Sequence, residues 1–172
     1  MLFRSVIPLG APVFKEYQLQ VDDDPLFAGL NVSQSVGSIN MLQFTPSTPL
    51  VDGKKYYWRV RAVNINNEVS NWSVVFNFRT PYLAPTSLTP AGAVIGLRPP
   101  FDWADVNGAT GYTIQVSRNS TFTLLVVNAN TVSSTYTPLV NLPATTLYWR
   151  VRATGPNSRG PWSATIAITV SP

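Results

Sequence analysis

The chain has 172 residues, of which 45% are hydrophobic and only 12% are charged, with 15 Pro, 10 Gly and no Cys or His. This composition supports a packed core, and the prolines argue against a helical bundle, so we expect an all-β protein. The lack of Cys and His excludes disulfides, thiol nucleophiles, Cys/His zinc sites and imidazole acid-base catalysis.

The net charge of +4 reflects 12 Lys and Arg against 8 Asp and Glu. Nucleic-acid binding rests on clustered basic residues, whereas no stretch of this chain packs more than two of them together. No window approaches the roughly 20 apolar residues of a membrane helix. We therefore expect no nucleic-acid partner and no membrane insertion of this segment.

The first five residues, MLFRS, contain a Leu-Phe-Arg-Ser run that looks like the translated end of a sequencing adapter. We expect a gene fragment whose native sequence starts near Val6, with a natural start and an unusual first domain as the alternative. Pro8, Gly10 and Pro12 interrupt any apolar region, so the stretch is a poor signal peptide. We expect no signal sequence in this fragment.

Two strands with clear alternation follow, at residues 16–21 and 56–62, because successive side chains of a strand point to opposite faces. The expected inner positions are Tyr17, Leu19, Val21, Tyr56, Trp58, Val60 and Ala62. The expected outer positions are Gln18, Gln20, Tyr57, Arg59 and Arg61. Each strand therefore has an apolar face and a polar face.

The three acids Asp22, Asp23 and Asp24 directly follow the first of these strands and are the only acidic cluster. Adjacent carboxylates could share a calcium ion, but the spaced Asp-x-Asp-x-Asp pattern of a calcium loop is absent. We expect a solvated turn here, with a calcium site as the alternative, and no cofactor for the chain.

Residues 81–90 form a Pro-rich junction that runs into a second domain at residues 84–172. Apolar alternation between Gly, Pro, Asn and Ser turns predicts seven strands there. They are residues 86–90, 99–103, 111–116, 123–128, 134–138, 146–153 and 163–170. Seven short strands predict a two-sheet sandwich with Trp103, Tyr112 and Trp149 in its core.

Four blocks of sequence occur twice in the same order, which indicates two copies of one domain. Residues 16–21, 44–46, 56–62 and 72–73 match residues 111–116, 136–138, 147–153 and 162–163. The first copy, residues 1–80, has no counterpart of the strand with Phe101 and Trp103, because the offset of 95 puts Val6-Ile-Pro8 there. We expect it to lack its first strand and most of its second, and to fold poorly without the other copy.

The combined pattern resembles the fibronectin type III family, over nearly all of residues 84–172 and about 14–80. The resemblance rests on the Trp103 strand, Tyr112-Thr-Ile-Gln-Val116, the Leu50 to Tyr56 spacing before Trp58, and the closing Trp-Ser pairs. It implies an immunoglobulin-like sandwich and a corner tyrosine at Tyr56, for which the second copy has Leu147. More narrowly, the chain is similar to repeats of large secreted or surface proteins of bacteria, which act as spacers, adhesion modules or companions of polysaccharide-degrading domains.

Each copy also has an Arg-x-Arg pair followed by a Trp-Ser pair. Trp72 comes 11 residues after Arg61, and Trp162 comes 10 residues after Arg152. The pattern is similar to the ladder of cytokine-receptor type III domains, in which such arginines stack with the tryptophan. We expect Arg59, Arg61 and Trp72, and likewise Arg150, Arg152 and Trp162, to stack within about 6 Å as a structural ladder. A surface that binds an acidic or sugar partner is the alternative.

None of the eight acids pairs with another in a predicted cleft, so we expect no catalysis of the glycosidase type. The sequence favours a non-catalytic extracellular spacer, adhesion or protein-interaction module of a larger secreted or surface protein. Its expected partners are neighbouring domains and a protein or polysaccharide. The alternatives are an accessory module of a secreted polysaccharide-degrading enzyme and a receptor-like ectodomain that binds a protein.

Overall fold

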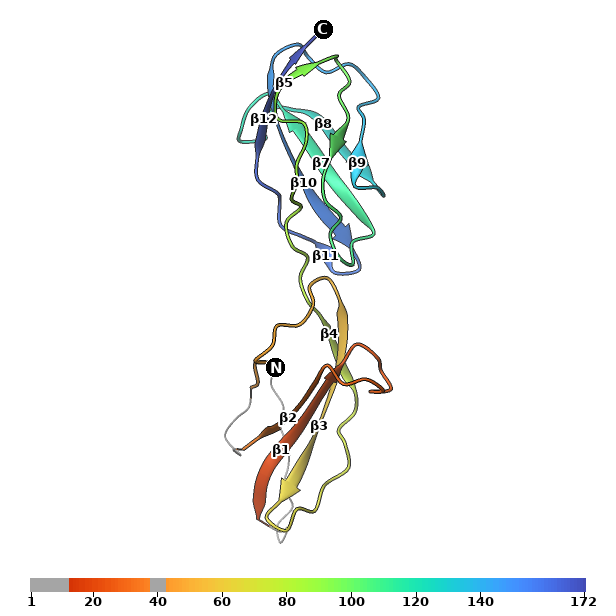
Figure 1. Cartoon of the computed structure of the whole chain (residues 1–172), viewed down its shortest axis with the longest axis vertical. Helices are drawn as coiled ribbons and strands as arrows, with labels where there is room; N and C mark the ends of the chain where they lie inside the picture. The colour runs from red at the N-terminus through yellow and green to blue at the C-terminus, as the bar shows by residue number, and fades with distance from the viewer. Residues whose placement is uncertain (1–12, 38–42) are drawn as a thin grey trace. The chain divides into compact units, whose positions relative to one another are not determined.

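The structure is a computed structural model that describes residues 13–37 and 43–172 (Figure 1). In these ranges the chain contains strands and turns but no helix, so the expected all-β class is confirmed. The chain divides into two compact units, Met1–Thr80 (unit 1) and Pro81–Pro172 (unit 2). The expectations about the first five residues and Val6 lie outside the described residues.

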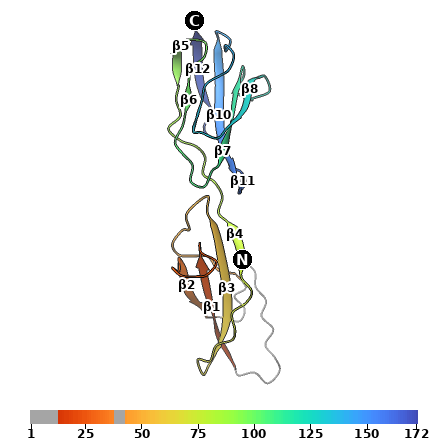
Figure 2. The same cartoon turned by 90° about the vertical axis from the view of Figure 1, so that its right-hand side faces the viewer.

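Unit 1 contains one antiparallel sheet in the order β2-β1-β3-β4. Its strands are β1 (Phe14–Asp22), β2 (Val32–Val36), β3 (Lys55–Asn64) and β4 (Phe76–Arg79). Figures 1 and 2 show β1, β2 and β3 side by side. The pairing sets Val21 opposite Trp58 and Gln18 opposite Arg61, so apolar side chains share one face and polar side chains the other.

The core of unit 1 lies on the apolar face of this sheet. It consists of Tyr17, Leu19, Val21, Val36, Tyr56 and Trp58. Trp58 is 8% exposed, and Val60 and Ala62 are only half-buried. Within residues 13–37 and 43–80 no second sheet covers this face, which explains why two of the expected inner positions are incompletely buried.

Unit 2 is a sandwich of two sheets. The larger sheet has the order β5-β12-β10-β7-β8, with β11 paired to β10, and the smaller one pairs β6 with β9. The strands are β5 (Gly92–Ile95), β6 (Phe101–Asp102), β7 (Gly111–Ser117), β8 (Leu125–Thr131), β9 (Thr135–Tyr136), β10 (Thr146–Gly155), β11 (Ser158–Arg159) and β12 (Ile166–Ser171). Phe101 of the smaller sheet packs on Trp149 of the larger, with 5.0 Å between the ring centroids.

The predicted strand at residues 86–90 is wrong. Thr89 exchanges two backbone hydrogen bonds with Asp102, but only as an isolated bridge, since Pro90 has no N–H to continue the ladder. The chain then adopts a φ of 72° at Gly92 and continues as β5, which pairs in parallel with β12 of the other sheet. Glycine permits this change of sheet because it tolerates positive φ.

The strands predicted at residues 99–103 and 134–138 are shorter than expected and correspond to β6 and β9. Those predicted at residues 123–128 and 163–170 begin later than expected, at Leu125 and Ile166. Residues 123 and 124 belong to a turn in which the Asn119 side-chain carbonyl accepts hydrogen bonds from both backbone N–H groups. At Ser163, the hydroxyl accepts a hydrogen bond from the N–H of Val151, in the place of a strand carbonyl. In both cases a side chain replaces the backbone pairing that a longer strand would need.

Tyr82 anchors the beginning of unit 2, although the sequence suggested only an extended junction. It is 3% exposed, and its hydroxyl donates to the carbonyl of Gly108 and accepts a hydrogen bond from the N–H of Asn157. A Cβ added to Gly160 would lie 2.9 Å from the Cβ of Tyr82. Unit 2 therefore uses glycine to let the tyrosine ring approach its backbone.

Candidate functional site

The outer face of unit 1 pairs arginines of β3 with glutamines of β1. The Arg59 Nε donates a hydrogen bond to Gln20 Oε1 at 2.9 Å, and the Arg61 Nε donates to Gln18 Oε1 at 2.8 Å. Each pair sits directly across the two strands, as the strand register requires. The guanidinium groups are thus oriented along the sheet surface.

Trp72 lies over both of these guanidinium groups. Its ring centroid is 4.6 Å from Cζ of Arg59 and 4.5 Å from Cζ of Arg61. The following residue fixes the loop, because the N–H of Ser73 donates to the carbonyl of Val60 and the Ser73 hydroxyl accepts from the N–H of Val60. The Trp-Ser pair therefore combines a backbone anchor with a stacking ring.

Phe27 adds a second aromatic contact to Arg59, with its ring centroid 4.1 Å from Cζ of Arg59. It stands in the turn after β1 with a φ of 59°, and its counterpart Phe122 has a φ of 58°. Sequence analysis did not assign Phe27 to the ladder. The signal that could have found it is the repeated phenylalanine at the same offset of 95.

Unit 2 repeats the arrangement. Cζ of Arg150 lies 3.9 Å from the Phe122 ring centroid and 4.3 Å from that of Trp162, which is also 4.3 Å from Cζ of Arg152. The Arg150 Nε and Nη2 donate to Gln115 Oε1 at 3.0 and 2.8 Å. Burial lowers the pKa of Arg150 and of Arg152 from their usual values, yet both stay protonated at neutral pH, as arginine does in proteins.

The two ladders differ at one rung. The position of Gln18 is occupied in unit 2 by Thr113, whose hydroxyl donates to Asn130 Oδ1 at 2.8 Å. The buried Nε of Arg152 has no hydrogen-bond partner among the described residues. Compared with unit 1, the ladder of unit 2 keeps its ring contacts and lacks one hydrogen bond. Each exposed cation–π contact contributes about 0.5–1 kcal/mol.

Tyr56, Tyr112 and Tyr57 make contacts that stabilise the fold. The Tyr56 hydroxyl accepts a hydrogen bond from the N–H of Val51 at 3.0 Å. In unit 2 Leu147 occupies the equivalent position and is fully buried. There the Tyr112 hydroxyl accepts from the N–H of Val106 at 2.9 Å, which ties a different loop to the sheet. Tyr57 is half-buried, and Lys55 Nζ lies 4.6 Å from the centroid of its ring.

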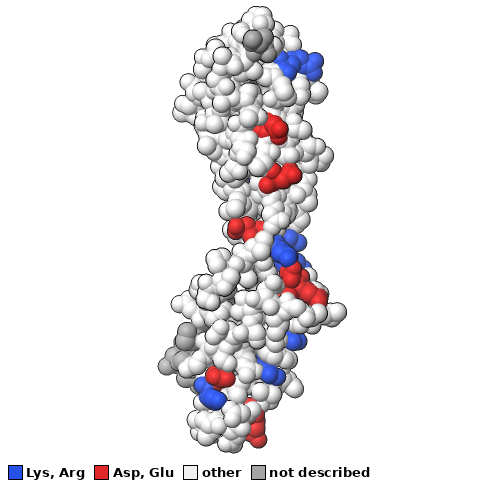
Figure 3. All heavy atoms as spheres, viewed as in Figure 1, with Lys and Arg blue, Asp and Glu red and all other residues white. Residues whose placement is uncertain are grey.

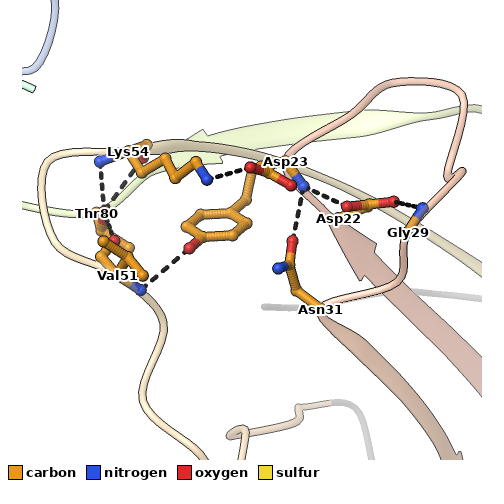
Figure 4. Close-up of polar contacts among 8 residues, drawn as sticks. Asp22, Asp23, Gly29, Asn31, Val51, Lys54 and Thr80 are labelled. Carbon is orange, nitrogen blue, oxygen red and sulfur yellow. Dashed lines mark hydrogen bonds and ion pairs between the residues drawn. The ribbon is translucent and has the colours of Figure 1, made fainter.

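The expectation of a solvated turn is wrong for Asp22, which is 1% exposed. Its carboxylate accepts hydrogen bonds from the N–H groups of Asp23 and Gly29 at 2.8 and 3.2 Å (Figure 4). In unit 2 the same position is held by Ser117, which is also buried. The buried Asp22 carboxylate therefore stabilises the turn after β1 through these two hydrogen bonds instead of facing water.

Asp23 and Asp24 also have partners within the protein. Asp23 forms an ion pair with Lys54, whose hydrogen bond lowers the pKa of the Asp23 carboxyl (Figure 4). Asp24 Oδ1 accepts from the N–H of Leu26 at 3.0 Å. Among the described residues no group of three or more His, Cys, Asp or Glu side chains could hold a metal ion, so the geometry does not support the calcium alternative.

Basic groups, in blue, and acidic groups, in red, are scattered among uncharged atoms on the face that Figure 3 shows. This face carries no continuous basic stripe of the kind that nucleic-acid binding requires. Among the described residues no helix is long and apolar enough to cross a membrane.

Comparison with known proteins supports the fold of both units. Residues 12–84, less than half of the chain, match a family model described as the N-terminal immunoglobulin domain of Rha78A-like proteins. No curated protein matches the sequence. A two-domain fibronectin type III segment of chicken tenascin is similar at 9% identity, with a TM-score of 0.59, over 94% of this chain and 87% of that segment.

The FN1-FN3 domains of chicken CNTN1 are similar at 14% identity, with a TM-score of 0.49. The match covers 94% of this chain, which spans 58% of that structure's length. The family model and the tenascin segment indicate an immunoglobulin-like, fibronectin type III-like fold. At such low identity to solved structures, the likeness establishes the fold alone.

Proposed function

We propose that this chain is a non-catalytic spacer and interaction module of a larger secreted or surface protein. The observation that carries the proposal is the pair of matching ladders. In each unit the arginine, glutamine and aromatic side chains that a catalytic or sugar-binding site would present to a ligand are engaged with one another. Their repetition in two units with different loops supports a structural role.

The ladder supports a spacer role because it joins four segments of each unit. In unit 2 these are Gln115 on β7, Arg150 on β10, Phe122 in the turn after β7, and Trp162 in the loop before β12. Pulling on the ends of the domain would have to separate these contacts together with the strand pairing. A module of this kind resists extension while it leaves chemistry to neighbouring domains.

Mechanical unfolding tests this proposal. The chain would be held between two well-characterised marker domains and stretched in a force-spectroscopy experiment. Unit 2 should unfold in one cooperative step with a length gain of roughly 300 Å for its 90 or so residues, and Trp162→Ala should lower the unfolding force. Unfolding of unit 2 without a distinct force peak would contradict the spacer role.

A second candidate is an accessory module of a secreted polysaccharide-degrading enzyme. The observation that bears on it is the family model over residues 12–84, whose description as an N-terminal domain fits a module that accompanies further domains. Retention on insoluble polysaccharide, lost in Trp72→Ala and Trp162→Ala, would support this candidate. A hydrolase domain in the full reading frame would support it further.

A further inference from the structure

The outer face of the larger sheet of unit 2 has an open hollow at Gly111, the first residue of β7. Its volume is about 640 Å³, and its lining includes Asn130 of β8 and Thr154 of β10. A Cβ added to Gly111 would lie 3.0 Å from the backbone oxygen of Thr131 and 3.3 Å from Oγ1 of Thr154. A larger residue would have to displace these atoms, so the glycine leaves the hollow unfilled.

Unit 1 has a glutamate at the equivalent position. The repeat offset of 95 aligns Gly111 with Glu16. The strand pairing agrees with this alignment. Glu16 lies opposite Val63 of β3, and Gly111 lies opposite Thr154 of β10. The Glu16 carboxylate accepts a hydrogen bond from the Ser35 hydroxyl at 3.1 Å. The repeat therefore accommodates a carboxylate at a place where unit 2 has none.

Two arginines adjoin the hollow. Arg152 precedes Thr154 by two residues and shares its face of β10, and Arg159 of β11 pairs directly with Thr154 (Figure 1). Cross-strand partners project on the same side of a sheet. Burial, and then the charges of Arg159 and Arg150, lower the pKa of Arg152. The hollow is therefore bordered by positive charges that lie close to one another.

This excess of positive charge is specific to unit 2. Val69 takes the place of Arg159 in unit 1, because it bridges Val63 just as Arg159 pairs with its partner on β10. The Arg61 Nε of unit 1 donates to Gln18. Relative to unit 1, the outer face of unit 2 lacks a carboxylate here and has one more cation.

No acidic side chain neutralises these arginines within the described part of the chain. Neither Arg152 nor Arg159 forms an ion pair there, and the buried Arg152 Nε has no hydrogen-bond partner. The acids of residues 81–172 are Asp102 and Asp105, which lie on and after β6 of the smaller sheet. Residues 1–12 and 38–42 contain no Asp or Glu, so the segments outside the described ranges supply no carboxylate side chain.

We propose that the hollow at Gly111 binds a glutamate or aspartate side chain of an acidic polypeptide segment. Its carboxylate accepts charge-assisted hydrogen bonds from the guanidinium groups of Arg152 and Arg159. The Asn130 Oδ1 already accepts from the Thr113 hydroxyl, which leaves the amide N–H groups of Asn130 to donate, as Ser35 does in unit 1.

Two observations favour a polypeptide as the source of the carboxylate. The repeat itself accommodates a glutamate side chain at this position, as Glu16 shows. Val132, which also lines the hollow, is 85% exposed and offers an apolar contact to the carbon atoms of such a side chain. The binding activity rests on the interaction role proposed above and gives it a partner. Failure of binding would leave the force peak of unit 2 unchanged, so the two can fail separately.

An NMR titration of the full isotope-labelled chain tests the proposal, with a tetraglutamate peptide blocked at both ends as the probe. We expect saturable shifts of the signals of Gly111, Asn130 and Thr154. A tetraglutamine peptide of the same design should bind at least about tenfold more weakly, the effect of roughly 1.4 kcal/mol. Equal binding of the two peptides would overturn the proposal, as would shifts confined to unit 1 or the lack of saturable binding.

Two arginine variants locate the site. Arg159→Val introduces the residue of unit 1 at an exposed position and should weaken tetraglutamate binding at least about tenfold. Arg118→Val is the matched control. It removes the same charge from an exposed position just after β7, roughly 20 Å along the strand from Gly111. It should bind as the unchanged chain does. Equal weakening in both variants would overturn the assignment of the hollow.

Tetragalacturonate, which carries four carboxylates on a sugar chain, distinguishes the source of the ligand. It should bind more weakly than tetraglutamate, because its carboxylates are attached directly to rings and lack the flexible stem of a glutamate. Equal or tighter binding of tetragalacturonate would overturn the assignment to a polypeptide and would favour an acidic polysaccharide.

Discussion

Trp58 in unit 1 and Trp149 in unit 2 occupy the same position of equivalent strands, but their surroundings differ. Trp149 is 0% exposed beneath Phe101, whereas Trp58 is 8% exposed. On the opposite faces of the same strands, the arginine contacts match closely, because Arg59 and Arg150 each contact two aromatic rings.

The comparison distinguishes contacts made within one sheet from burial between two sheets. The ladder depends on the register of two neighbouring strands and on one loop, and these are present in both units. Core burial depends on an opposing sheet, which the described part of unit 1 lacks. The outer face of a repeat can therefore form where the described residues supply no second sheet over its inner face.

Separating the two units gives the largest expected effect. Residues 81–172 alone should melt cooperatively, because the two sheets of their sandwich bury Phe101 and Trp149 between them. Residues 1–80 alone should melt at least about 10 °C lower, a difference of roughly 2 kcal/mol for a domain of this size. Calorimetry of both fragments and of the whole chain measures this. Equal melting temperatures would show that unit 1 does not need a second sheet.

Replacing the equivalent tryptophans sharpens the comparison. Trp149→Ala should destabilise unit 2 by about 3–5 kcal/mol, the usual cost of removing a fully buried large aromatic side chain. Trp58→Ala should cost unit 1 less, because Trp58 is 8% exposed, whereas Trp149 is fully buried. Hydrogen exchange measured across a urea titration reports the unfolding of each unit separately. Equal losses of stability in the two variants would contradict a difference in burial between the two tryptophans.

The ladder tryptophans should instead behave alike. Trp72→Ala and Trp162→Ala each remove two cation–π contacts, so each should cost about 1–2 kcal/mol. The same urea titration measures both variants. A loss in one unit only would break the equivalence of the two outer faces.

Restoring the missing rung should have a smaller, stabilising effect. Thr113→Gln would place an acceptor opposite Arg152, as Gln18 lies opposite Arg61 in unit 1. A new hydrogen bond should raise the stability of unit 2 by about 0.5–1.5 kcal/mol, less the loss of the contact to Asn130. The reverse change, Gln18→Thr, is the matched control and should destabilise unit 1. Stabilisation by both changes would contradict the role of this rung.

The smallest effect concerns the pH dependence of unit 1. The Lys54 hydrogen bond lowers the Asp23 pKa below its ordinary value of 3.8, so the folded state binds the proton more weakly than the unfolded state. The resulting stability is fully present above this ordinary value and is lost as pH falls through the lowered pKa. Lys54→Met should remove this part of the acid sensitivity in urea titrations between pH 5 and 2. An unchanged pH profile would show that the ion pair does not contribute.

Much of the outer face could be predicted from the sequence, because the alternation along residues 56–62 and the repeated Trp-Ser pairs already identify the ladder positions of Arg59, Arg61 and Trp72. Phe27 was missed because a turn phenylalanine with positive φ has no local signature. The burial of Asp22 was not predicted, since three adjacent carboxylates after a strand indicate a solvated turn. The burial depends on the turn of residues 23–29, whose Asp23 and Gly29 N–H groups donate to the carboxylate.

The sequence by itself determined the all-β class, the duplication and the two faces of each strand, because these follow from period-two alternation and repeated spacing. The tertiary structure alone decided the docking of Tyr82 against Gly160, the crossing of the chain into β5, and the covering of Trp149 by Phe101. These contacts join segments that are distant along the chain. Their stability comes from packing between elements, which a local pattern does not encode.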